Sequence, residues 1–75
     1  MKKFNPGDIV RISSSDYKTI YGKIGVFYKY TFLDNSICAV FIPDMPYDGG
    51  ILFKDDSLLN LCHIVMRDQI EAVGD

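Results

Sequence analysis

The sequence predicts an all-β domain: a small barrel of five or six short antiparallel strands, with a 3-10 turn near the C-terminus. Short apolar runs alternate with turn-forming residues about every 8–12 residues, which is typical of small barrels. Two glycines, Gly22 and Gly25, flank the start of the second apolar run, where a bend or a positive φ would exclude a Cβ atom. The chain of 75 residues is too short for more than one domain, so residues 1–75 are expected to form a single unit.

The first predicted strand is Ile9–Ile12. Its residues alternate, with Val10 and Ile12 on one face and Arg11 on the other. Residues 13–21 follow as a polar loop, because serine and aspartate side chains bond to their own backbone and compete with regular structure. We therefore expect the first two strands to be joined by a long arm that carries two tyrosines.

The second predicted strand covers residues 24–32 and is apolar on both faces, as in a strand that bends between two sheets. Its predicted faces are Val26, Tyr28 and Tyr30 on one side and Phe27 and Lys29 on the other. A turn over residues 33–36 leads to a third strand at residues 37–42. Residues 43–50 form a long turn, since two prolines exclude them from a sheet interior, and a short strand is expected at residues 51–53.

Residues 58–66 leave two alternatives open. A strand is favoured because Ile64 and Val65 are β-branched and the chain around them is rich in strands. A helix is the alternative, because Asp56 or Ser57 can cap it and apolar residues recur at helical spacing. Of the two, we expect the strand.

Two motifs resemble known families. Residues 7–12 read G-D-x-V-x-I and residues 22–27 read G-K-x-G-x-F, which resembles the KOW motif, a strand and a loop followed by G-K-x-G-x-V. Phe27 stands at the place of the final valine, and the loop is longer than usual. The C-terminal part resembles the end of SH3-like barrels, with a 3-10 turn over Arg67–Gln69 and a closing strand over residues 70–73. The resemblance implies an SH3-like barrel, and KOW domains typically bind RNA or proteins of the ribosome and of transcription complexes.

Composition and charge exclude some classes of protein. A hydrophobic fraction of 48%, with five Phe and five Tyr, excludes disorder. Residues 1–30 carry six basic and two acidic side chains, a net charge of +4, whereas residues 31–75 carry two basic and eight acidic ones, a net charge of −6. These charges cancel in space if the two halves interleave in the fold. No signal peptide or bilayer-spanning apolar run is visible, so we expect a cytoplasmic protein with no membrane partner.

Groups that catalyse reactions or bind metals are sparse. The single histidine, His63, lies between apolar neighbours and is expected to be structural. Cys38 and Cys62 lack CxxC spacing and are expected to be buried, reduced thiols on strands, with a disulfide between adjacent strands as the alternative. Together with His63 they offer three zinc ligands without a fourth. We therefore expect no catalytic residue, no metal and no cofactor, and we do not expect an enzyme.

Aromatic and charged side chains are the candidate binding groups. Tyrosines interleave with lysines in residues 17–30, where bases can stack on the rings and lysines can meet phosphates, unless the rings belong to the core. A tyrosine in the proline-containing turn is a second candidate contact. The candidate binding residues are Tyr17, Lys18, Tyr21, Lys23, Lys29, Asp44, Tyr47 and Asp48.

Three functions fit these features. The first is a non-enzymatic SH3-like module that binds another protein through residues 17–21 and 43–50, and it is favoured because the sequence pI of 5.1 is low for a nucleic-acid-binding domain. The second, implied by the KOW resemblance, is binding of RNA, the ribosome or a transcription complex through the basic first half. The third is a small acidic phage or mobile-element inhibitor whose carboxylates mimic nucleic acid. A homodimer is compatible with the opposite charges of the two halves.

Overall fold

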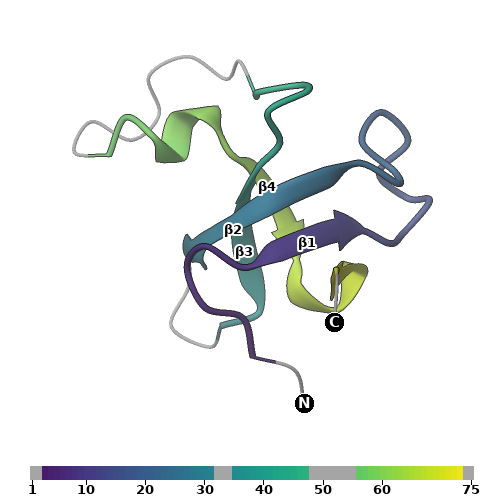
Figure 1. The fold of residues 1–75 in the computed structure, drawn as a ribbon, viewed down its shortest axis with the longest axis horizontal. Helices are drawn as coiled ribbons and strands as arrows, with labels where there is room; N and C mark the ends of the chain where they lie inside the picture. The colour runs from purple at the N-terminus through teal and green to yellow at the C-terminus, as the bar shows by residue number, and fades with distance from the viewer. Residues whose placement is uncertain (1–2, 32–34, 48–55, 74–75) are drawn as a thin grey trace.

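Five strands form one antiparallel sheet in the computed structural model, which describes residues 3–31, 35–47 and 56–73 (Figure 1). The strands are β1 (Ile9–Ile12), β2 (Ile24–Tyr30), β3 (Ile37–Phe41), β4 (His63–Met66) and β5 (Ile70–Ala72). Within these ranges the helical elements are two 3-10 turns, η1 (Leu59–Leu61) and η2 (Arg67–Gln69), and no helix is long and apolar enough to cross a bilayer. The predicted all-β class and the C-terminal 3-10 turn are confirmed. The strand expected at residues 51–53 lies outside the described residues.

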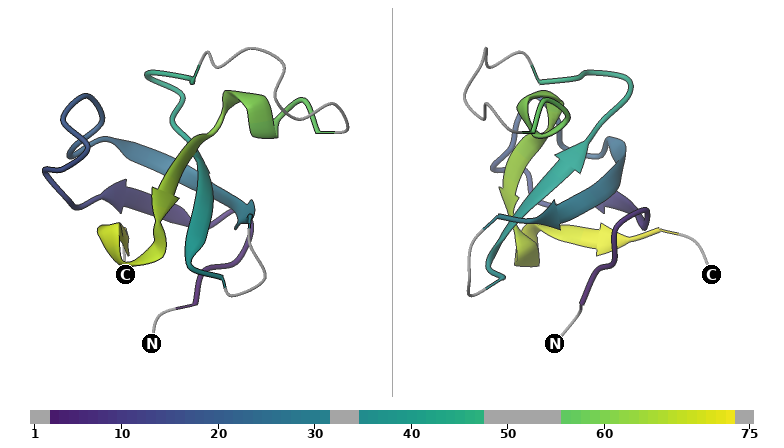
Figure 2. Two further views of the ribbon diagram at one scale, coloured as in Figure 1. Left: turned by 180° about the vertical axis from the view of Figure 1, so that it is seen from behind. Right: turned by 90° about the vertical axis from the view of Figure 1, so that its left-hand side faces the viewer.

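The strands are ordered β4-β3-β2-β1-β5, so β5 returns to pair with β1. β4 and β5 are the two edges, and no strand pairing joins them in the part of the chain that the structure describes. The sheet is strongly curved. Its curvature brings β4 behind β1 and β2 in Figure 1, and in front of them in the rear view of Figure 2. The structure shows an open, curved sheet where the sequence predicted a small barrel.

The residues of β1 alternate between the two faces of the sheet, as predicted, and two of its side chains lie in the core. Val10 and Ile12 are fully buried, whereas Arg11 is exposed and pairs with Glu71 of β5. Glu71 lies directly opposite Arg11 in the β1–β5 ladder, so this ion pair links the first and last strands of the chain across the sheet.

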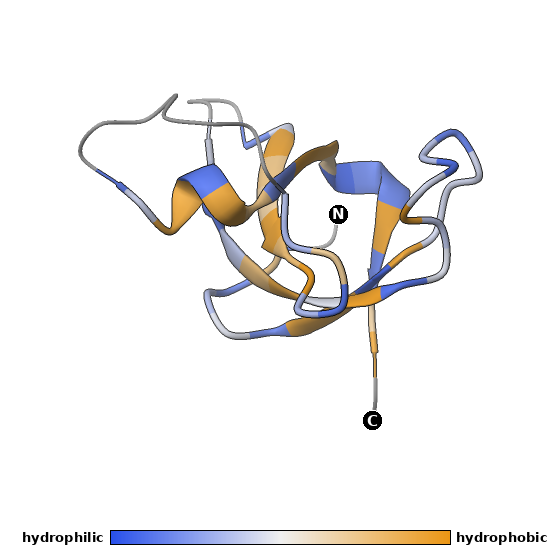
Figure 3. Cartoon of the chain, turned by 90° about the horizontal axis from the view of Figure 1, so that it is seen from above, coloured by the Kyte–Doolittle hydropathy of each residue, from blue (hydrophilic) through white to orange (hydrophobic). Residues whose placement is uncertain are grey.

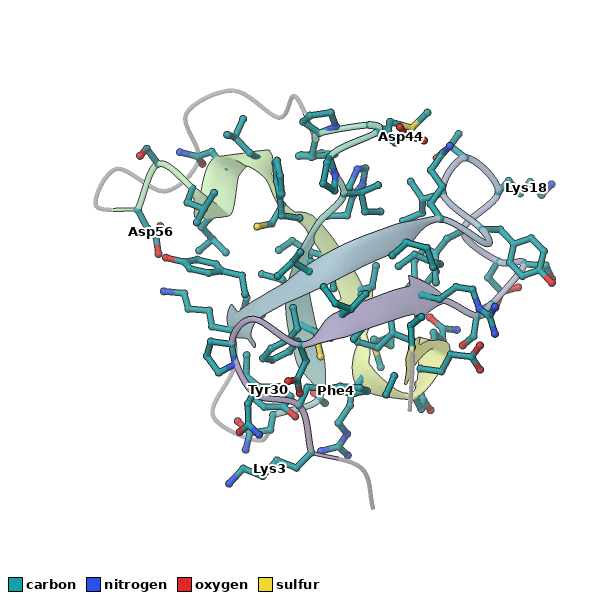
Figure 4. All side chains as sticks on the ribbon, viewed as in Figure 1. Lys3, Phe4, Lys18, Tyr30, Asp44 and Asp56 are labelled. Atoms are coloured by element: carbon teal, nitrogen blue, oxygen red, sulfur yellow. The ribbon has the colours of Figure 1, made fainter. Side chains whose placement is uncertain are left out.

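An irregularity in β2 changes which of its residues face the core. The pairing with β3 shifts between Phe27 and Lys29, so Tyr28 has no residue opposite it. The rings of Phe27 and Tyr30 therefore pack together, with centroids 4.9 Å apart. The predicted placement of Tyr30 on the opposite face from Phe27 is wrong, because simple alternation takes no account of a bulge. The Tyr30 hydroxyl accepts a hydrogen bond from the Phe4 N–H at 2.8 Å, and Figure 4 shows these two residues close together.

β3 is buried on both faces and separates two hydrophobic clusters. Cys38 and Val40 belong to the main core, which β1, β2 and β4 also supply. Ala39 belongs to a smaller cluster on the other side, with Leu59 and Cys62. Figure 3 shows the apolar residues concentrated on the strands and on η1, and the loop between β1 and β2 mostly hydrophilic. The turn η1 therefore acts as a small cover over one face of β3.

The two cysteines lie in different clusters and are both buried and free. Burial raises the pKa of each thiol to about 11, so both are weak nucleophiles at neutral pH. Cys38 lies on a strand as predicted. Cys62 lies between η1 and β4 instead, which corrects the prediction for that residue.

Residues 58–66 do not form the single strand that the sequence predicts. Their first half is η1, and β4 begins only at His63. The Asp56 carboxylate accepts a hydrogen bond from the Leu59 N–H at 3.2 Å, and Leu59 packs on Ala39. The N-cap residue of η1 is Leu58, which makes no side-chain cap hydrogen bond. The first half of the segment is therefore a single 3-10 turn, neither the predicted strand nor the alternative helix capped by Asp56 or Ser57, and the strand is right for the second half.

Both glycines at the start of β2 have a structural requirement. Gly22 has a φ of +82°, a conformation that strains any residue with a Cβ atom. Gly25 has no such φ, but a Cβ atom there would lie 2.7 Å from Cγ1 of Val40, 2.8 Å from the Phe41 carbonyl oxygen and 3.0 Å from Cγ1 of Ile42. Gly25 therefore allows β2 to approach the end of β3 closely.

Candidate functional site

A pocket of about 250 Å³ lies where the loop between β1 and β2 meets β4 and the turn before residue 48. Two of the predicted binding residues, Tyr17 and Tyr47, line it, although they are far apart in the sequence. The lining consists of Tyr17, Thr19, Ile20, Tyr47, Leu59, Asn60, Cys62, His63, Ile64 and Val65. No Lys, Arg, Asp or Glu is among these residues, so the pocket is neutral and mostly apolar in the part that the structure describes.

The first wall of the pocket is the loop that carries Tyr17. The Tyr17 carbonyl accepts hydrogen bonds from the N–H groups of Ile20, at 3.0 Å, and Tyr21, at 2.7 Å, which fold the loop into a tight turn. Ile20 is buried in the main core and anchors the turn. The Tyr17 hydroxyl accepts a hydrogen bond from the Met66 N–H at 3.0 Å, so the tyrosine links the loop to β4. This wall is therefore attached to the core through Ile20 and to β4 through Tyr17.

The second wall is formed by Tyr47 and the turn before it. The Tyr47 N–H donates to the Leu61 carbonyl at 2.9 Å, which ties the turn to η1. His63 Nε2 lies 2.7 Å from the Met45 carbonyl oxygen, and its ring packs edge-on against that of Tyr47, with centroids 5.4 Å apart. Tyr47 is nevertheless 47% exposed. A fixed aromatic ring therefore presents part of its surface at the rim of the pocket.

The predicted charged binding residues do not gather in the pocket. Lys23 and Asp44 form a loose ion pair, with Nζ 3.8 Å from the carboxylate. Lys18 lies on the exposed loop between β1 and β2 and Tyr21 is 56% exposed, but neither lines the pocket (Figure 4). Lys29 belongs to a different contact, with Asp56. The last candidate, Asp48, lies outside the described residues.

Among the described residues, three ion pairs join the basic first half of the chain to the acidic second half. Arg11 pairs with Glu71, Lys23 with Asp44, and Lys29 with Asp56 at 2.9 Å. Each pair joins a cation from residues 1–30 to an anion from residues 31–75. The charge asymmetry of the sequence is therefore partly cancelled in the fold, as interleaving of the halves predicts.

Asp56 is the centre of a small polar network that fixes the start of η1. Its carboxylate lies 2.9 Å from Lys29 Nζ and accepts a hydrogen bond from the Tyr28 hydroxyl, which lies 2.9 and 3.0 Å from the two oxygens. The hydrogen bonds from Lys29 and Tyr28 lower the pKa of Asp56, and burial opposes them. The same contact with Asp56 raises the pKa values of Tyr28 and Lys29. The network ties β2 to the segment that covers β3.

We expect Asp56→Asn to lower the melting temperature at pH 6 and to have little effect near pH 2. A carboxyl group whose pKa is lower in the folded protein stabilises the fold above its unfolded pKa, about 3.9, and this contribution is lost as the pH falls through the folded pKa. Thermal melts of both proteins between pH 2 and pH 6 measure the difference. Asp68→Asn, at an exposed carboxylate on η2, is the matched control. A difference between wild type and Asp56→Asn that is the same at both ends of this range would contradict the network.

A second depression, of about 330 Å³, lies beside the β1–β5 pairing. The ion pair of Arg11 and Glu71 belongs to its lining, together with Tyr21. The charged groups of Arg11 and Glu71 already pair with each other. A ligand would therefore gain less free energy of binding here than in the neutral pocket. Tyr21 therefore provides an exposed tyrosine that lies outside the main pocket.

Sequence reasoning missed Ile64, Leu59 and Asn60 as pocket residues. No local pattern separates Ile64 from a core residue; the pairing of Ile64 with Ala39 places it on the face of β4 opposite Val65, away from the main core. His63 has a structural contact, as predicted, but it also lines the pocket. Among the described residues, no three side chains of His, Cys, Asp or Glu lie close enough together to hold a metal ion.

Comparison of the chain with protein-family models, with curated proteins and with solved structures finds no match.

Proposed function

We propose that this chain is a non-enzymatic binding module, of the SH3-like kind that its sequence resembles, which takes a short segment of another protein into the pocket between Tyr17 and Tyr47. The observation that carries the proposal is that the two tyrosines, from separate loops, line one neutral pocket. Aromatic rings that are already held in place lose little entropy on contact, which is why such residues dominate protein interfaces.

The size of the pocket suits one large side chain. An apolar cavity of about 150 Å³ holds a benzene ring, so a pocket of about 250 Å³ accommodates a leucine or an aromatic side chain. The polar groups at its rim, such as Asn60 and His63, are few, as in most small binding sites. The ligand that fits is a neutral, apolar residue of a peptide.

The neutral lining also bears on the KOW-type alternative. A site for RNA or DNA needs cations that face phosphates, and no described Lys or Arg lines this pocket. Lys23, Lys29 and Arg11 are engaged with carboxylates. The same ion pairs also neutralise the carboxylates of Asp44, Asp56 and Glu71. They therefore give no more support to an acidic inhibitor that mimics nucleic acid than to a protein that binds nucleic acid.

The test is a selection for binding from a displayed library of short linear peptides, followed by affinity measurements on the selected peptide. We expect Tyr47→Ala to weaken binding by about 30-fold, because an aromatic hot-spot contact is worth about 2 kcal/mol. Tyr21→Ala is the matched control, since Tyr21 is as exposed as Tyr47 but lies outside the pocket, and it should change the affinity by less than about threefold.

Salt dependence separates peptide from nucleic acid. Binding to the selected peptide should change little between about 50 and 200 mM salt, whereas a contact with several phosphates loses about 10³-fold over that range. The proposal fails if no peptide is selected, if Tyr47→Ala binds as well as wild type, or if single-stranded RNA binds more tightly than any selected peptide with that steep salt dependence.

A further inference from the structure

The hydrogen bonds of β4 show which of its backbone groups face the open edge of the sheet. Arg67 N–H donates to the Ser36 carbonyl on the β3 side, whereas Met66 N–H points the other way and donates to the Tyr17 hydroxyl. In an antiparallel pair the N–H and C=O groups of alternate residues point to the same side. The N–H and C=O of Ile64, two residues before Met66, therefore also point away from β3.

Ile64 lies at the place where this edge meets the pocket. Ile64 is 42% exposed and lines the pocket, and it pairs with Ala39 on the β3 side of the strand. The structure gives its outward N–H and C=O no hydrogen-bond partner among the described residues. An edge that presents such groups is a template for a further strand. Here the unpaired backbone groups of the edge belong to a residue that lines the apolar pocket.

We propose that the bound segment is an extended peptide that adds to the sheet beside β4 and exchanges two backbone hydrogen bonds with Ile64. One of its apolar side chains then enters the pocket between Tyr17 and Tyr47. The inference rests on the proposed function and specifies how that site recognises its ligand. Main-chain hydrogen bonds provide affinity in this mode, and the pocket selects the side chain.

The occupant is a single extended chain of a partner protein and not the β4 strand of a second copy. Tyr17 already occupies the N–H of Met66, so the free stretch of edge is short. Two folded domains joined edge to edge need a longer ladder, whereas a peptide needs this pair and the pocket. A proline at the paired position is excluded, because proline has no N–H to donate.

An N-methyl scan of the selected peptide tests the pairing. Methylation of one backbone nitrogen at a time should weaken binding by at least about tenfold at the residue opposite Ile64, because one hydrogen bond is lost and the methyl group meets the strand. The adjacent nitrogens should tolerate methylation, since they point away from β4. Side chains are unchanged throughout the scan, so it isolates the main chain.

Two measurements on the protein give the other half of the test. In the wild type, the Ile64 amide should exchange with deuterium faster than the Val65 amide when the protein is free, and should become protected when the selected peptide is bound.

Ile64→Pro should weaken binding by at least about tenfold, because proline is tolerated at an outward edge position but removes the donor. Ile64→Val keeps the donor and changes only the side chain, so the loss of affinity caused by Ile64→Pro should exceed the loss caused by Ile64→Val by at least about tenfold. If Ile64→Pro does not fold, the exchange measurement on wild type stands alone.

The outcomes separate the two proposals. A peptide that binds and depends on Tyr47, but tolerates N-methylation at every position and leaves the Ile64 amide unprotected, overturns the strand addition and leaves the proposed function in place. A peptide that does not depend on Tyr47 overturns both. Loss at one methylated nitrogen, together with protection of Ile64, supports the inference.

Discussion

Gly25→Val is expected to unfold a large fraction of the protein at room temperature. The added Cβ would meet a methyl group of Val40 and the carbonyl oxygen of Phe41, both under 3.0 Å away, and the backbone oxygen can yield only if β2 and β3 separate. We expect a loss of about 3 kcal/mol or more, against a total stability of about 3–5 kcal/mol for a domain of this size.

Urea denaturation followed by circular dichroism measures this loss. Ile24→Val is the matched control, since it places the same side chain one residue earlier at an exposed position, and it should cost less than about 1 kcal/mol. A Gly25→Val protein that unfolds at the same urea concentration as wild type would mean that β2 does not approach the end of β3 as the structure has it.

Phe27→Ala is expected to have an effect of similar size through the core. Phe27 is 1% exposed, and its ring packs against Phe4, at 5.7 Å between centroids, and Tyr30. Removing a buried phenylalanine costs about 3–5 kcal/mol, because apolar contacts are lost and a cavity remains. The expected result is a protein without a cooperative thermal transition at 25 °C and above.

Val26→Ala tests the face assignment of β2 beside it. Val26 precedes Phe27 and is only partly buried, so its truncation should cost about 1 kcal/mol. Thermal melts of the two variants give the comparison. Equal destabilisation by Phe27→Ala and Val26→Ala would contradict the placement of Phe27 in the core.

The strands that alternate cleanly were predictable from sequence. In β1 the pattern of Val10, Arg11 and Ile12 has one interpretation, and the structure confirms it. The C-terminal turn η2 and the short closing strand β5 were also predicted. Local patterns of this kind depend on one strand at a time, so they do not require the rest of the fold.

Features that depend on pairing were not predictable. The bulge at Tyr28 arises from the register between β2 and β3, and it moved Tyr30 to the face of Phe27. Likewise, η1 replaced the first half of a predicted strand where Asp56 accepts a hydrogen bond from the Leu59 N–H and Leu59 packs on Ala39, a contact between distant segments. Tertiary contacts overrode strand propensity there.

The candidate site was predictable in part. Tyr17 and Tyr47 were chosen because rigid aromatic residues in loops are frequent contacts, and the structure places both at one pocket. The lysines and aspartates were chosen for their charge, and the fold uses three of those predicted, Lys23, Lys29 and Asp44, in ion pairs. Sequence alone does not show which charges neutralise each other. That information comes only with the strand order.

Nuclear magnetic resonance titration of the wild type with the selected peptide tests the central claim most directly. We predict that the largest shifts of backbone amide signals fall on Thr19, Ile20 and Ile64, which line the pocket, and that Arg11 and Glu71 in the second depression stay unchanged. Shifts that centre on Arg11, Tyr21 and Glu71, or on Lys3 and Lys18 with an RNA oligonucleotide in place of the peptide, would contradict the assignment of the pocket between Tyr17 and Tyr47 as the binding site.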